Sequence, residues 1–384
     1  MGLLFESSIN RIFLYGRQEV TYMTYVESPP ESVKNDALIT RDNNADDDLE
    51  ASKRNIQRKD HYVFNNTVVV TGREPAAIFN YIHVGLFAIC GCAMRILTDH
   101  LFGTLAKIQT VNGVITKSFI PNIFGCFMAG TLQGSPMGGT SLASLYTGLV
   151  LGFCGSYTTW STWSQQLSLL VIGETKSGAQ SQLLFLICLI VGMYVFFGSY
   201  RVGQDFGRTI GRKVGVRVMR RGKAVSDVTS TIVLAVCLPC FILLIVLNIS
   251  ARAKTILLAL IFAPVGACLR LWLSHFKVIR YHFPLGTFIC NICGAVLLSL
   301  LHVIVIRVPG IHCIDSSVIC WPAAAIYSVD IGFCGCLTTV SALVSETYDI
   351  IQNHKLYAYS YAAVSVIATQ ICIGLVNGIN YGIS

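Results

Sequence analysis

GFCGSYTTWSTW at residues 152–163 is repeated later in the chain as GFCGCLTTVSAL at 332–343. Each copy lies within a set of apolar segments, and the two sets follow the same order. A repeat of this kind predicts two related halves, with a binding or permeation path where the halves meet. The copies differ just after their shared threonines, where we expect a substrate to come closest.

The composition predicts an all-α integral membrane protein. Hydrophobic residues make up 53% of the chain and charged residues only 12%, whereas a soluble domain has about 25% charged residues. The apolar runs begin near residue 78 and have lengths near the ~20 residues that cross a bilayer as a helix. No nucleophile–base set, metal-ligand cluster or Walker A sequence stands out, so we expect no enzyme.

Nine spans are predicted, as four, one and four. They lie at about 78–97, 118–133, 142–164, 182–200, 228–250, 255–275, 284–306, 322–344 and 357–379. We therefore divide the chain into a disordered cytoplasmic tail (1–77), a first four-helix repeat (78–200), a basic cytoplasmic loop (201–227), a linker transmembrane helix (228–250) and a second four-helix repeat (255–380).

Loop charge predicts the orientation. The loop 201–227 is strongly basic, which places it in the cytoplasm by the positive-inside rule. A nucleic-acid partner is discounted because this loop adjoins membrane on both sides. An even number of spans precedes it, so the N-terminus is cytoplasmic and, after nine spans, the C-terminus extracellular. The single linker span starts the second repeat from the opposite face, which predicts an inverted repeat.

Two polar residues recur at matching positions in the first and second spans of each half. Arg95 and Arg270 each end a GxxxR sequence, and Asn122 and Asn291 each lie among small residues. An arginine at a span end either snorkels to the interface or guards an anion vestibule. A buried asparagine either joins helices or offers its NH2 group to an anion. Recurrence in both halves favours a pore-lining role for the asparagines.

The repeated box predicts a break in the third span of each half. Gly155 precedes Thr158 and Gly335 precedes Thr338, and glycine followed by threonine permits a helix to open and free its carbonyls. Two breaks that meet on a pseudo-two-fold axis would present backbone oxygens to a small structural cation.

After the break, the first half is aromatic and the second is not. Trp160 and Trp163 lie three residues apart on one helix face, and their positive ring edges suit an anion. An interfacial aromatic belt is the other interpretation. Val340 and Leu343 occupy the same positions in the second half, which suggests that one pathway has been kept and the other lost.

These landmarks together resemble the fluoride exporter family, the small bacterial dual-topology fluoride channels and their fused two-domain eukaryotic relatives. The resemblance extends over about residues 78–380. It implies a fluoride-selective channel that exports cytoplasmic fluoride passively across the plasma membrane and confers fluoride resistance. Its partners would be fluoride and the lipid bilayer, and the chain is expected to act as a monomer.

The resemblance also implies roles for individual residues. The vestibule arginines would be Arg95 and Arg270, and a central sodium ion would be held by the backbone carbonyls of Gly155, Thr158, Gly335 and Thr338. The anion pathway would comprise Asn122, Asn291, Trp160, Trp163, Thr159, Ser161, Thr162, Ser341, Phe153 and Phe333. Bacterial members have phenylalanines in the box, where this chain has tryptophans or aliphatic residues.

Two other functions stay open. A proton-coupled transporter of fluoride or another small anion needs a titratable group at mid-membrane, and Asp330 is the candidate. A non-conducting scaffold would use the repeats only for packing. Most of the 15 cysteines lie in apolar runs as small hydrophobes, but Cys313 and Cys320 share an outer loop and are a candidate disulfide.

Overall fold

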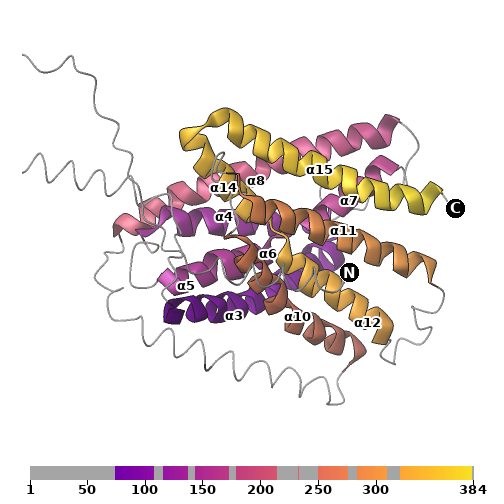
Figure 1. Cartoon of the computed structure of the whole chain (residues 1–384), viewed down its shortest axis with the longest axis horizontal. Helices are drawn as coiled ribbons and strands as arrows, with labels where there is room; N and C mark the ends of the chain where they lie inside the picture. The colour runs from indigo at the N-terminus through magenta and orange to yellow at the C-terminus, as the bar shows by residue number, and fades with distance from the viewer. Residues whose placement is uncertain are drawn as a thin grey trace, which may run out of the picture. The chain divides into compact units, whose positions relative to one another are not determined.

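The computed structural model describes residues 74–107, 116–136, 143–172, 179–213, 250–275, 283–308 and 321–382, together with Ile232. Every element in these ranges is helical (Figure 1). The predicted tail up to residue 73, the basic loop beyond Lys213, nearly all of the linker span and the Cys313–Cys320 pair lie outside the described residues.

The first half contains the four predicted helical segments. They are α3 (Glu74–Asp99) with its continuation η3 (His100–Leu105), α4 (Phe119–Gly134), the segment α5 (Ala143–Thr147), η5 (Gly148–Cys154), α6 (Gly155–Tyr157) and α7 (Trp160–Ile172), and α8 (Ala179–Lys213). Pro121 falls in the first turn of α4, where a helix tolerates a missing N–H.

The second half repeats this order. It comprises α10 (Ala251–Leu273), α11 (Leu285–Arg307), the segment α12 (Trp321–Tyr327), η8 (Ser328–Cys334), α13 (Gly335–Leu337) and α14 (Val340–Asn353), and α15 (Lys355–Gly382). Ser250 caps α10, since its hydroxyl accepts a hydrogen bond from the Ala253 N–H.

Six helical stretches of the described chain are long and apolar enough to cross a membrane, judged by length and composition. These are Ile78–Leu105, Ala179–Gly211, Arg252–Leu273, Leu285–Arg307, Trp321–Asn353 and Lys355–Asn380. The 16-residue α4 and the α5–α7 segment are not among them. The all-α prediction is confirmed over the described residues, whereas nine spans and their inversion stay predictions.

The helices that follow the two breaks pack on the opposite half. Helix α7 contacts α11 and α15 of the second half, and α14 contacts α4 and α8 of the first. Helices α4 and α8 lie close together because glycines are spaced four apart on both, Gly130 and Gly134 on one and Gly203 and Gly207 on the other. A Cβ at any of these would clash with the backbone of the facing helix.

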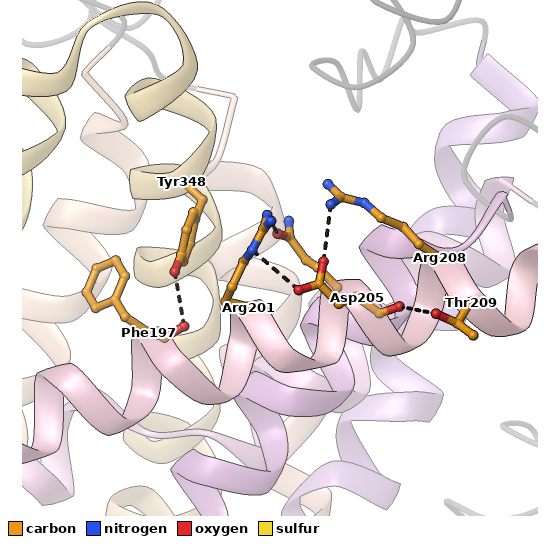
Figure 2. A network of polar contacts seen from close by, with 7 residues as sticks. Phe197, Arg201, Asp205, Arg208, Thr209 and Tyr348 are labelled. Carbon is orange, nitrogen blue, oxygen red and sulfur yellow. Dashed lines mark hydrogen bonds and ion pairs between the residues drawn. The ribbon is translucent and has the colours of Figure 1, made fainter.

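Helix α8 continues beyond the predicted end of its span at residue 200. Figure 2 shows polar contacts along this extension: Asp205 lies 3.6 Å from Arg201 and 3.3 Å from Arg208, and its carbonyl accepts a 2.8 Å hydrogen bond from Thr209. These i,i+3 and i,i+4 contacts support an exposed helix. The first part of the predicted basic loop is therefore helical.

Candidate functional site

The two predicted breaks are present. Thr158 and Thr159 separate α6 from α7, and Thr338 and Thr339 separate α13 from α14. Thr158 and Thr338 have nearly equal extended conformations, with φ and ψ of −87° and 151° in the first and −91° and 149° in the second. Equal geometry at both breaks follows from the equal sequence of the two boxes.

The breaks meet through their hydroxyl groups. Thr158 Oγ1 lies 3.1 Å from Thr339 Oγ1, and Thr159 Oγ1 lies 3.2 Å from Thr338 Oγ1. The hydroxyl contacts extend into the helix that follows each break. On α7, the Ser161 hydroxyl accepts a 2.9 Å hydrogen bond from Thr338. In the other direction, Ser341 Oγ lies 3.1 Å from Thr158 Oγ1. The expectation that the breaks meet is confirmed, and their contact is a buried cluster of hydroxyls.

The two asparagines hold the breaks open. Asn122 Oδ1 accepts a 2.8 Å hydrogen bond from the Thr159 N–H, and Asn122 Nδ2 donates to the Thr159 carbonyl at 3.1 Å. Asn291 makes the same pair of contacts with Thr339, at 2.8 and 3.1 Å. Each amide thus replaces the helix hydrogen bonds that the break gives up. One N–H of each NH2 group makes this contact, and the pore-lining role stays a prediction.

Arg95 and Arg270 lie in the interior and not at an exposed span end. Each is only 2% exposed and reaches the other half's box. Arg95 donates to the carbonyls of Gly335 at 2.5 Å and Ile331 at 2.6 Å. Arg270 donates to the carbonyl of Gly155 at 2.9 Å, to that of Cys336 at 2.6 Å and to that of Leu151. Their part in an anion vestibule stays a prediction.

This arrangement bears on the expected sodium ion. Two of the four carbonyls assigned to it, those of Gly155 and Gly335, already accept hydrogen bonds from guanidinium groups. Positive groups beside the same oxygens repel a further cation, most strongly where the surroundings are dry. The residues as arranged here do not fit a sodium site.

The tryptophans and their aliphatic counterparts belong to one buried cluster. Trp160 and Trp163 have ring centroids 5.4 Å apart, and Val340 and Leu343 are packed in the same core. Trp160 donates its indole N–H to Thr369 of α15 at 3.1 Å. The Trp163 indole nitrogen is buried with no hydrogen-bond partner among the described residues.

The remaining pathway candidates lie at the edges of this core. Phe153 and Phe333 are half-buried in η5 and η8, and Phe153 packs on Tyr157 with centroids 5.7 Å apart. Thr162 is half-buried on α7 and lies outside the described hydroxyl contacts.

A polar strip on α7 was missed. Ser161, Ser164, Gln165 and Ser168 share one helix face by their spacing, and all four are buried. Gln165 and Ser168 of this strip hydrogen-bond Asn377 of α15. Asn377 in turn accepts a hydrogen bond from Ser299 of α11. Four polar residues at helical spacing within the eight positions 161–168 were the available signal, and the prediction included only Ser161 of them.

The fold and site define a helical membrane protein built of two similar halves that interlock at paired helix breaks. The chain belongs to the family described as CrcB-like protein, Camphor Resistance (CrcB), which matches residues 82–200 and 257–378. The two matched segments correspond to the two halves.

Individual relatives share about a third or less of their aligned residues with this chain. "Fluoride export protein 1" of Candida albicans is 28% identical over 247 residues, which cover 61% of this chain and 61% of that protein. "Fluoride export protein 1" of Neurospora crassa is 27% identical over 251 residues, 58% of this chain and 45% of that protein. "Fluoride-specific ion channel FluC" of Psychrobacter cryohalolentis is 36% identical over 97 residues, 25% of this chain and 71% of that protein. The chain thus spans less than two thirds of its fungal relatives. No solved structure gives a significant match.

Proposed function

We propose that the chain is a passive, fluoride-selective channel that exports cytoplasmic fluoride across the plasma membrane, and that it is not an enzyme. The observation that carries the proposal is the interior hydroxyl crossing of Thr158, Thr159, Thr338 and Thr339, flanked by two asparagine amides. The names of the bacterial and fungal relatives support fluoride as the ion.

The chemistry of the crossing suits a small hydrated anion. Such a path has to replace water with many modest hydrogen-bond donors and must not bind the ion too tightly. Hydroxyls, one remaining N–H on each asparagine amide and indole ring edges meet this need. The arginines are engaged with backbone carbonyls, so their charge attracts an anion without a direct ion pair that would trap it.

The side of the hydroxyl crossing that carries Trp160 and Trp163 of α7, called the tryptophan side below, is the conducting side in this proposal. Trp160 joins the hydroxyl of Thr369, whereas the corresponding Val340 has only apolar atoms to offer. Asn122, Asn291, Thr159, Ser161 and Ser341 form the central part of the path.

The architecture that goes with this function is a monomer of two inverted four-helix repeats joined by a linker helix. The N-terminus would be cytoplasmic and the C-terminus extracellular. A negative interior potential then drives fluoride outward with no other energy source. The crosswise packing of α7 and α14 supports a single unit in which both halves are needed.

Proton-coupled transport is the second candidate, because one observation favours it. Asp330 lies in η8, and its Oδ1 is buried with no hydrogen-bond partner among the described residues. A carboxyl group in such a place is a proton site by default. Asp330→Asn distinguishes the two functions: a channel keeps its fluoride efflux and shows no proton movement, whereas an exchanger loses both.

Fluoride efflux from liposomes that contain the purified protein tests the proposal, with chloride efflux measured in parallel. Rapid fluoride release with chloride retained is expected. The Trp160→Ala/Trp163→Ala double variant should lose it, and Trp321→Ala, at an exposed tryptophan of α12, should keep it. A monodisperse, folded wild-type protein that releases no fluoride would sink the channel proposal.

A further inference from the structure

Two three-helix polar networks occupy corresponding places on the two sides of the crossing. Asn377 of α15 joins α7 and α11, and Gln133 of α4 joins α8 and α14. Each network is centred on one amide, Asn377 or Gln133, and includes residues of one post-break helix, α7 or α14. Their hydrogen-bond partners differ, and this difference distinguishes the two sides for an anion.

The Asn377 network is neutral and buried. Asn377 Oδ1 accepts hydrogen bonds from Gln165 Nε2 at 3.2 Å and from the Ser299 hydroxyl at 2.8 Å. Asn377 Nδ2 donates to the side-chain oxygen Oε1 of Gln165 at 3.2 Å and to the Ser168 hydroxyl at 3.1 Å. All four residues are buried, Asn377 to 1% exposure. A reciprocal amide pair can exchange its mutual bonds for an anion, because each NH2 group then turns one N–H to it.

The Gln133 network is acidic. Gln133 Oε1 accepts from Tyr200 at 2.5 Å and from Ser345 at 2.7 Å, and its NH2 group donates to the carboxylate of Asp349 at 3.2 Å. The amide donor is thus already bound to a negative group. A fluoride ion there would meet the repulsion of Asp349.

Further polar residues lie on either side of the Asn377 network. Ser164, whose buried hydroxyl has no partner among the described residues, lies on the α7 strip between Ser161 at the crossing and Ser168 at the network. Beyond Asn377, one turn further along α15, Asn380 accepts a 2.6 Å hydrogen bond from the exposed Arg307 of α11. These polar residues therefore lead from hydroxyls through an amide pair to a cationic mouth.

We propose that Gln165 and Asn377, with Ser168 and Ser299, form a second anion-binding station on the path, with Arg307 as the cation at its mouth. The inference rests on the proposed fluoride efflux and adds its outward arm. The ion leaves the threonine crossing, passes Trp160, displaces the amide–amide hydrogen bonds at Asn377, and emerges beside Arg307. In the predicted orientation this mouth faces the outside.

Matched substitutions of the two central amides test the station. Asn377→Leu and Gln133→Leu both remove a buried amide that joins three helices, so both should lose comparable thermal stability. Asn377→Leu should slow fluoride efflux from liposomes about tenfold or more, a loss of the order of one hydrogen-bonded group's contribution. Gln133→Leu should leave the efflux within about twofold of wild type, because an acidic side carries little anion.

Two milder variants separate a loss of the station from a loss of folding. Gln165→Met keeps the side-chain volume and removes one amide, and should also slow efflux several-fold. Arg307→Gln should raise the fluoride concentration needed for half-maximal efflux and leave the folded fraction unchanged. Equal slowing by Asn377→Leu and Gln133→Leu, or wild-type efflux in Gln165→Met, would overturn the station. A silent wild type would instead refute the channel itself, and the station with it.

Discussion

Arg95 Nη1 of α3 donates a 2.5 Å hydrogen bond to the carbonyl of Gly335, a residue of the opposite half's box. Arg270 makes the reciprocal contact to Gly155 at 2.9 Å. Two buried guanidinium groups thus reach from one half to the other and bind backbone carbonyls near the breaks. A planar group with several N–H donors suits this task, and a lysine ammonium does not.

Arg95→Lys should therefore destabilise the protein although charge is kept. Loss of one of the two contacts, to Gly335 or Ile331, costs about 1.5–3 kcal/mol for a hydrogen bond to a charged group. Thermal unfolding in detergent measures the effect. Arg208→Lys on the exposed end of α8 is the control, and it should change stability by no more than about 0.5 kcal/mol. Equal stability of both variants would contradict the bridging role of Arg95.

The glycines between α4 and α8 give a second prediction. Gly130→Ala places a methyl group against the Tyr200 carbonyl, so the helices must separate, at a cost of about 1–3 kcal/mol. Gly198→Ala on α8 meets nothing within 4 Å and should be neutral or stabilise the helix by about 0.5–1 kcal/mol. Denaturation curves of the two variants separate close packing from a general effect of alanine.

The asparagine contacts predict equal structural costs in the two halves. Asn122→Ala and Asn291→Ala each leave the N–H and carbonyl of a break threonine without a side-chain partner, which costs about 1–3 kcal/mol per group. Unfolding temperatures of the two variants should fall together. A fall in only one of them would show that the two breaks are not equivalent.

The Trp160–Thr369 contact allows a test of the tryptophan side without a cavity. Thr369→Val keeps the shape of the threonine and leaves the indole N–H unpaired, which should cost about 1–3 kcal/mol and slow fluoride efflux. Thr131→Val on α4, whose hydroxyl bonds only its own helix at Phe127, is the control and should keep efflux. Normal efflux in Thr369→Val would argue against a path beside Trp160.

Much of the fold is legible in the sequence because the same landmarks occur twice. The two Gly–Thr boxes predict paired breaks, and their equal residues do produce equal geometry. The limits lie in contacts between the halves. Periodicity along one helix does not say that Arg95 reaches Gly335, or that α7 packs on α15.

The candidate site is predictable only in part for the same reason. The threonines and asparagines stand out within their own spans, whereas Gln165, Ser299 and Asn377 are ordinary polar residues until three helices bring them together. The end of α8 shows another limit. Hydropathy places a span end at residue 200, but it does not show that α8 continues to Lys213 with Gly203 and Gly207 packed on α4.

The reach of Arg95 has a consequence for how the protein is made. Its partner carbonyls belong to residues 236 and 240 positions further along the chain. While the ribosome is still synthesising the second half, Arg95 lacks its two carbonyl partners, and the post-break helix α7 lacks its neighbours α11 and α15. The two halves can therefore assemble fully only after the second box has been synthesised, when translation is almost finished.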